Sequence, residues 1–246
     1  MEIGIQFFTL RDFCKDLENF SESLKKVADI GYRNVQISGT CEFEAEWLKK
    51  ELDKNGLKCV LTHTPASKLK NELSKVLTDH SIIDCDNIGL GYYDFNGDDN
   101  FDDFFKNYIP IAEEIKSIGK YFMYHNHAHE FAKKDGKLII EHIADRFSPE
   151  ILGITLDTFW VQAGGGDPAQ WLEKLSGRVP CIHLKDFAFD KKMAVVGEGN
   201  INFDRVFQKA GEAGTKYMLV EQDDCNGENP FDCIKRSYDY LKSRGF

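Results

Sequence analysis

The sequence predicts one (β/α)8 barrel domain that spans residues 1–246. Short β-type runs alternate with amphipathic helical runs from end to end, which is typical of parallel strands joined by helices. In the second half, four side chains of the kind that bind metals each close a different predicted strand, about one βα unit apart. A doubly wound sheet would need a glycine-rich turn after its first strand, and the segment QFFTLRD (6–12) has none.

Eight strands are expected in chain order. They cover residues 2–8, 34–38, 58–63, 87–91, 121–127, 153–157, 181–187 and 217–222. Two of the intervening helices are expected to begin at Asp167-Pro168 and Asn229-Pro230, because each pair places an N-cap before a proline in the first turn. Four glycines follow helical runs and are expected to end them in left-handed backbone: Gly31, Gly56, Gly119 and Gly214.

Composition limits the classes of partner. The formal net charge is −10, which disfavours nucleic acid because binders of phosphate backbones present a basic face. Seven cysteines occur without a CxxC pair, which indicates reduced thiols. No apolar run reaches the roughly 18 residues of a membrane span, and the start lacks a signal-peptide pattern. We therefore expect a cytoplasmic protein with a small-molecule partner and no membrane partner, and homo-oligomer formation stays open.

Four residues at the ends of consecutive strands form the candidate metal site: His125, Asp157, His183 and Glu221. Only every second side chain of a barrel strand faces the interior. His125 follows Met123 on such a face, and Glu221 follows Leu219. All four residues can therefore point inward at the carboxyl ends of their strands, where barrel active sites lie. Any one alone would be read as a structural histidine or a helix cap, but the four together predict one divalent cation.

Other residues near this site have two interpretations each. Lys185 shares the face of His183 and could stabilise a developing oxyanion, or it could form an ion pair with Glu221. His127 could contact substrate and Glu130 could add a carboxylate, or both could simply be polar loop residues.

Three further side chains are candidate substrate contacts. His63 closes the third strand and could touch substrate or act as a cap. Gln36, at the end of the second strand, is a weaker candidate. Trp160 could form an apolar wall for a sugar face, or pack against a neighbouring loop.

The chain resembles the xylose-isomerase-like barrel superfamily, whose members are usually described as sugar phosphate isomerases/epimerases. The resemblance rests on five segments: YHNHAHEF (124–131), LDTFWVQAGGGDP (156–168), HLKD (183–186), GEGNINF (197–203) and VEQD (220–223). In ketose epimerases of this group, a Glu, an Asp, a His and a second Glu bind one divalent metal, and the two Glu residues exchange the substrate proton. Asp157, His183 and Glu221 match this pattern by type.

His125 departs from the resemblance, because the epimerases carry a glutamate at that position. The metal site remains plausible, but one half of the two-carboxylate proton exchange is missing. The YHNH version is similar to members that act on keto-sugars or keto-inositols by elimination or hydration.

These observations predict a metal-dependent sugar isomerase or epimerase that acts on a keto-sugar or sugar phosphate through an enediolate. Glu221, Lys185 and His127 are the expected catalytic residues. Mn²⁺, Co²⁺, Zn²⁺ or Fe²⁺ is favoured over Mg²⁺, because two ligands are imidazoles. The alternatives are a keto-sugar or keto-inositol lyase or dehydratase, a metal-dependent endonuclease, and a sugar-binding barrel without catalysis or serving as the partner subunit of a larger enzyme.

Overall fold

A closed parallel barrel forms the centre of the computed structural model, which describes residues 1–95 and 98–246, with side chains for 1–95 and 100–246. Within these residues, eight strands close the barrel in the order β1-β12-β9-β8-β5-β4-β3-β2. They are β1 (Glu2–Gln6), β2 (Asn34–Ile37), β3 (Lys58–His63), β4 (Asn87–Leu90), β5 (Tyr121–His125), β8 (Leu152–Asp157), β9 (Cys181–Leu184) and β12 (Tyr217–Val220). The predicted (β/α)8 fold is confirmed.

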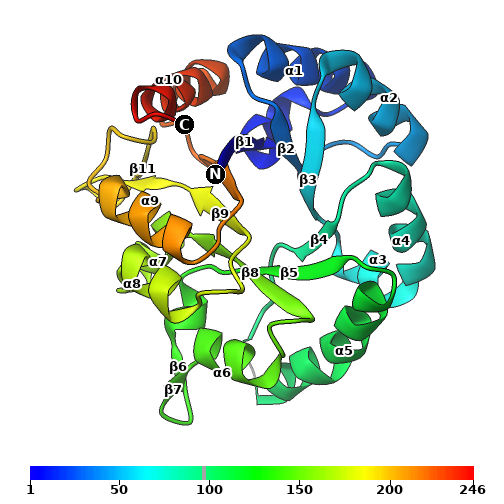
Figure 1. The fold of residues 1–246 in the computed structure, drawn as a ribbon, viewed down its shortest axis with the longest axis vertical. Coiled ribbons are helices and arrows are strands. Elements are labelled where there is room, and N and C mark those ends of the chain that lie inside the picture. Colours follow the sequence, from blue (N-terminus) through cyan, green and yellow to red (C-terminus); the bar gives the residue numbers. More distant parts are fainter. Residues whose placement is uncertain (96–97) are drawn as a thin grey trace.

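Helices surround the barrel (Figure 1). They are α1 (Leu17–Ile30), α2 (Ala45–Asn55), α3 (Ala66–Asn71), α4 (Leu73–Ile82), α5 (Asp98–Ser117), α6 (Ile139–Arg146), α7 (Thr158–Ala163), α8 (Pro168–Lys174), α9 (Phe203–Glu212) and α10 (Pro230–Ser243), with 3-10 turns η1 (Phe7–Phe13) and η2 (His129–Phe131). The last helix, α10, packs against α1 and β1, so the two ends of the chain complete the ring together.

The barrel interior is filled in layers, as strand alternation requires. Met123, Cys181 and Leu219 belong to a small apolar cluster inside the barrel. Each stands two residues before a predicted metal ligand on the same strand, so the ligands form the next layer toward the carboxyl ends. The register agrees, because His183 pairs with Asp157 on one side and Leu219 on the other.

The strand predicted over 181–187 is wrong in its second half. β9 ends at Leu184, and β10 (Asp186–Phe187) forms a separate antiparallel hairpin with β11 (Met193–Ala194). The break occurs because the Thr158 hydroxyl accepts a hydrogen bond from the Lys185 N–H at 3.0 Å and donates one to the Lys185 carbonyl at 2.7 Å. The backbone of Lys185 is therefore held by a side chain of α7.

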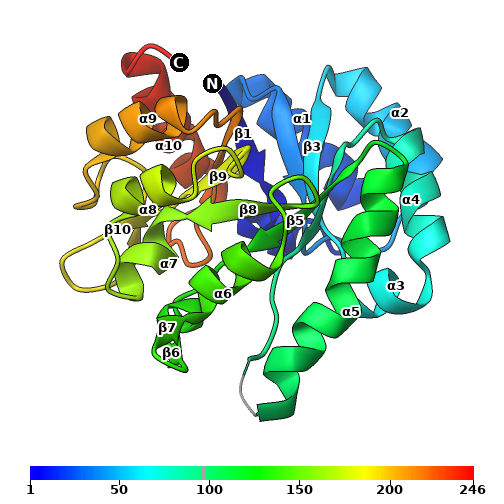
Figure 2. The same ribbon diagram turned by 60° about the horizontal axis from the view of Figure 1, so that its bottom comes forward.

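The predicted helix boundaries are confirmed. Asp167 accepts from the Ala169 N–H, and Asn229 accepts from the Phe231 N–H, at the first turns of α8 and α10. The four predicted glycines all have positive φ. A further hairpin of β6 (Lys133–Lys134) and β7 (Lys137–Leu138) projects beside α6 (Figure 2). Over residues 1–95 and 98–246, no helix has the length and apolar character to cross a membrane.

Candidate metal centre and substrate pocket

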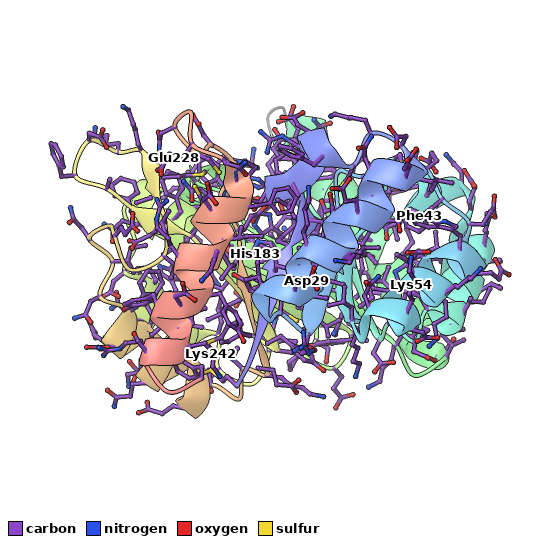
Figure 3. All side chains as sticks on the ribbon, turned by 90° about the horizontal axis from the view of Figure 1, so that it is seen from above. Asp29, Phe43, Lys54, His183, Glu228 and Lys242 are labelled. Atoms are coloured by element: carbon purple, nitrogen blue, oxygen red, sulfur yellow. The ribbon has the colours of Figure 1, made fainter. Side chains whose placement is uncertain are left out.

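The four predicted ligands meet inside the barrel. His125, Asp157, His183 and Glu221 each place a nitrogen or carboxylate oxygen within 4.8 Å of the others, and all four residues are buried. His183 Nδ1 lies 2.8 Å from Glu221 Oε2 and 3.7 Å from Asp157 Oδ2, and His125 Nε2 lies 3.1 Å from the same Asp157 oxygen. His183 lies in the interior, whereas Lys54 and Lys242 lie at the exposed rim (Figure 3).

The protons on the two imidazoles are fixed by their outer partners. His183 Nε2 lies 2.6 Å from the Gln36 side-chain oxygen, and His125 Nδ1 lies 3.1 Å from the Gly91 carbonyl. Both partners only accept, so each ring donates outward, as metal-binding histidines commonly do. The remaining lone pairs then face the carboxylates of Asp157 and Glu221. Among the described residues, His183 Nδ1 and Glu221 Oε2 have no hydrogen bond despite their closeness. Acceptors that converge in this way fit a cation between them.

The electrostatics favour the same conclusion. Burial opposes the charged forms, but Lys185, His125 and His183 together outweigh it and hold the pKa values of Asp157 and Glu221 well below their usual range. Burial also lowers the pKa of His183, yet Glu221 and Asp157 outweigh burial and raise it. With no metal present, a proton is therefore drawn to the point at which a metal would bind.

Lys185 joins the carboxylates of this cluster. Its ammonium lies 2.9 Å from Glu221 Oε2, 3.2 Å from Asp157 Oδ2 and 2.9 Å from Asp223 Oδ2. The ion pair with Glu221 that the sequence allowed is therefore present, within a larger network. The three carboxylates raise the pKa of Lys185 even though burial opposes this.

A cavity of about 360 Å³ opens above the cluster, a size typical of small-molecule sites. Its lining includes Gln6, Phe8, Ser38, His63, Thr64, Pro65, Ala66, Leu90, Gly91, Tyr92, His125, His127, Lys185, Glu221 and Asp223. The structure thus brings His63, His127, Lys185 and Glu221 together at one pocket.

His63 is held as a neutral hydrogen-bond donor toward this pocket. Its Nδ1 lies 3.4 Å from the Gln6 amide nitrogen and 3.3 Å from Ser38 Oγ. Because the Gln6 oxygen already accepts from the Phe8 N–H, its nitrogen donates to His63, which places the ring proton on Nε2. Burial holds the pKa of His63 well below its ordinary value. A β-carbon at Gly91 would lie 2.7 Å from this ring, so glycine is needed there.

His127 and Trp160 form one side of the site. Their ring centroids lie 5.3 Å apart, and the Lys185 ammonium lies 5.7 Å from the Trp160 ring. Burial lowers the pKa of His127 to about 2, so the ring is neutral. His127 lines the pocket, whereas Trp160 lines a separate cavity together with Phe159 and Gln162 of α7.

Besides Trp160, two further predicted substrate contacts, Glu130 and Gln36, lie outside the described pocket lining. Glu130 is fully buried and accepts hydrogen bonds from the Tyr124 hydroxyl and the His127 N–H. Gln36 is also fully buried, where its oxygen holds His183. We infer that both position neighbouring histidines, and a direct contact with substrate stays a prediction.

Asp223 was missed by the sequence interpretation. It bonds Lys185 and lines the pocket, and burial together with the charge of Glu221 raises its pKa to about 7. The signal was available, since Asp223 stands two residues beyond Glu221. In contrast, Asp186 accepts hydrogen bonds from the N–H groups of Gly197, Gly199 and Ile201, which hold that loop in place.

A family model described as xylose isomerase-like TIM barrel matches residues 24–244. The chain belongs to this family. Among curated proteins, an inosose dehydratase of Bacillus cereus (strain AH820) is 23% identical over 161 residues, which cover 54% of this chain and 53% of that protein. The chain thus spans about half the length of this curated relative.

Solved structures share the whole fold. A sugar phosphate isomerase/epimerase from Parabacteroides distasonis ATCC 8503 superposes with a TM-score of 0.86 and 23% identity, covering 99% of this chain and 94% of that one. A structure of L-ribulose 3-epimerase gives a TM-score of 0.77 at 14% identity, with coverage of 99% and 94%. At these identities the likeness establishes the fold.

Proposed function

We propose that the protein is a divalent-metal-dependent sugar isomerase or epimerase that acts on a neutral keto-sugar through an enediolate. The observation that carries this proposal is the convergence of two imidazole nitrogens and two carboxylates at the floor of a sugar-sized pocket. The family membership and the isomerase and epimerase structures of the same fold support the reaction class.

His125, Asp157, His183 and Glu221 would hold the cation. A divalent cation there would polarise a substrate carbonyl and stabilise the negative charge of the enediolate. Two imidazoles in the set favour Mn²⁺, Co²⁺, Zn²⁺ or Fe²⁺ over Mg²⁺.

Glu221 is the proposed base that removes the proton beside the carbonyl. It belongs to the ligand set and also lines the pocket. Its low pKa keeps it ionised, which is the form that a general base requires. Lys185 would hold a substrate oxygen and return a proton to it, while neutral His127 would accept from a substrate hydroxyl and His63 Nε2 would donate to a substrate oxygen. Asp223 orients Lys185 through the 2.9 Å contact.

The charges around the pocket favour a neutral substrate over a sugar phosphate. Of the lining residues, Lys185 carries the full positive charge, and three carboxylates already neutralise it. Arg11 lies nearby, but its guanidinium donates to the backbone carbonyls of Phe8 and Asp223. Away from the proposed metal, a phosphate dianion would meet Asp223 and would find no side-chain cation among the lining residues other than the neutralised Lys185.

Elimination beside the carbonyl is the second candidate. It is favoured by His125, which replaces the carboxylate of a symmetrical two-base exchange, and by the partial match to an inosose dehydratase. The Lys185 ammonium could then protonate a leaving hydroxyl or alkoxide. The first step, proton abstraction by Glu221, is common to both reactions.

Product analysis distinguishes the two reactions. The metal-loaded protein is incubated in D₂O with a panel of ketoses, keto-glycosides and keto-inositols, and products are identified by NMR and mass spectrometry. An isomer or epimer with solvent deuterium at the exchanged carbon supports the first proposal. Loss of water or of an alcohol selects elimination. If no sugar of the panel gains deuterium or changes, both proposals are contradicted.

A further inference from the structure

A second, smaller cavity adjoins the substrate pocket. It occupies about 180 Å³ between the carboxyl ends of β2 and β3 and the helices α2 and α4, which lie side by side outside these strands (Figure 1). Ser38, His63, Thr64 and Pro65 line both cavities. We call this second cavity the annex, and these four shared residues mark its junction with the substrate pocket.

The annex is too small to be a ligand site of its own, because small-molecule sites usually occupy about 300–1,000 Å³. Its inner wall includes the apolar side chains of Phe43, Ala45 and Val76. At its outer end, Lys68 forms an exposed ion pair with Glu42 at 2.7 Å. A small cavity of mixed polar and apolar lining, joined to the substrate pocket by shared residues, suits one attached group of a larger ligand.

A chain of hydrogen bonds that starts at His80 and runs through Thr62 fixes the direction of the Thr64 hydroxyl at the junction. His80 is buried, and burial lowers its pKa to about 4, so its ring is neutral. Its Nδ1 lies 2.7 Å from the Val76 carbonyl and must donate to it, which leaves Nε2 as an acceptor.

The Thr62 hydroxyl, 2.8 Å from His80 Nε2, therefore donates to that nitrogen. The Thr64 hydroxyl, 3.0 Å from Thr62 Oγ1, in turn donates to Thr62. With its proton used in this chain, Thr64 Oγ1 keeps lone pairs with which it can accept from a ligand hydroxyl at the junction.

We propose that the substrate is a keto-sugar that carries a second group through a glycosidic or ether bond, with that group seated in the annex. The proposal rests on the proposed function, since the reacting ring must lie at the metal cluster. Thr64 accepts from a hydroxyl of the ring or of the attached group. The four lining residues that the two cavities share and the fixed direction of the Thr64–Thr62–His80 chain support this placement.

The test compares a free 3-keto-hexose with its phenyl 1-glycoside, in which the ketone stays free, on the metal-loaded protein. Ala45→Leu fills the annex from its inner wall, and Thr40→Trp fills it from the partly exposed rim if the first variant folds poorly. Ala144→Leu on α6 is the matched control, because Ala144 is half-buried and lines neither cavity. Turnover gives kcat/KM for both sugars, and calorimetry gives both Kd values.

We expect the wild-type protein and Ala144→Leu to favour the glycoside at least tenfold in kcat/KM and in Kd. Filling the annex should remove this preference while the values for the free sugar change less than about threefold. Equal values for both sugars in the wild type, or a preference that survives both filling variants, overturns the proposal. If neither sugar turns over, the proposed function fails for these two sugars, and the Kd ratios alone still decide whether the annex binds the attached group.

Discussion

The Nδ1 atom of His183 and the Oε2 atom of Glu221 lie 2.8 Å apart, and the Lys185 ammonium lies 2.9 Å from the same oxygen. The outward bond of His183 to Gln36 directs the Nδ1 lone pair toward the carboxylate. Two acceptors at this distance repel each other unless a proton or a metal lies between them. This contact is therefore the strongest sign of a cation site.

Removing His183 should remove the metal. We expect His183→Ala to bind less than about one tenth of the metal per chain that the wild type binds, measured by elemental analysis after dialysis against low metal. His142→Ala, at a partly exposed position on α6, is the matched control and should retain the metal. Unchanged occupancy in His183→Ala would show that His183 is not a ligand.

Lys185 should compete with the metal for the same carboxylate oxygens. In Lys185→Met, Asp157, Glu221 and Asp223 lose their shared ammonium, and breaking such a buried network costs about 3–5 kcal/mol. The metal-free variant should melt at lower temperature, and added metal should raise its Tm by more than in the wild type.

Lys120→Met is the matched control for this experiment. Lys120 is also buried, but it donates to the carbonyls of His80 and Cys85. This variant should be destabilised without any change in the Tm shift caused by metal. If added metal shifts the Tm equally in Lys185→Met and Lys120→Met, Lys185 does not compete with the metal for the carboxylates.

Much of the site follows from strand periodicity. Alternation along the strands predicted that His125, Asp157, His183 and Glu221 face the interior, and the structure brings them together. Local signals also fixed the starts of α8 and α10, since a capping side chain and the following proline act within one turn.

Features that depend on distant contacts were not predictable from the sequence. The strand ends after Leu184 because Thr158, from another βα unit, binds the backbone of Lys185. Glu130 is buried because the Tyr124 hydroxyl and the His127 N–H lie in place to bond it. No local pattern shows which partner a loop residue finds once the barrel closes.

The value of kcat/KM should depend on the hydroxyl of Thr64 more than on its methyl group. Thr64→Val removes the proposed acceptor and should lower kcat/KM for the cognate sugar about 10- to 100-fold, since an unpaired buried polar group costs about 1–3 kcal/mol. Thr64→Ser keeps the hydroxyl and should stay within about threefold of the wild type. Equal losses in the two variants would mean that Thr64 acts only by packing.

Stability should depend on pH through His80. Its pKa falls from 6.5 to about 4 on folding, so below pH 6.5 the unfolded chain binds a proton that the folded protein resists. The free energy of unfolding should therefore fall as the pH drops from 6.5 to 4, by about 3 kcal/mol from this group. In denaturant titrations across this range, His80→Gln should show a smaller slope than the wild type. An identical slope would contradict the burial of a neutral His80.

Hydrogen exchange at the carbon beside the carbonyl tests the central claim most directly. A keto-sugar accepted by the wild type is incubated in D₂O with the metal-loaded wild type, the metal-free wild type and Glu221→Gln, and deuterium uptake is followed by NMR. The uptake rate of Glu221→Gln is compared with that of the wild type at the same metal occupancy. We predict rapid uptake only with the metal-loaded wild type and a 10²- to 10⁴-fold loss in Glu221→Gln, the usual cost of removing a general base. Exchange in Glu221→Gln within tenfold of the wild type, or equal exchange without metal, would contradict the account.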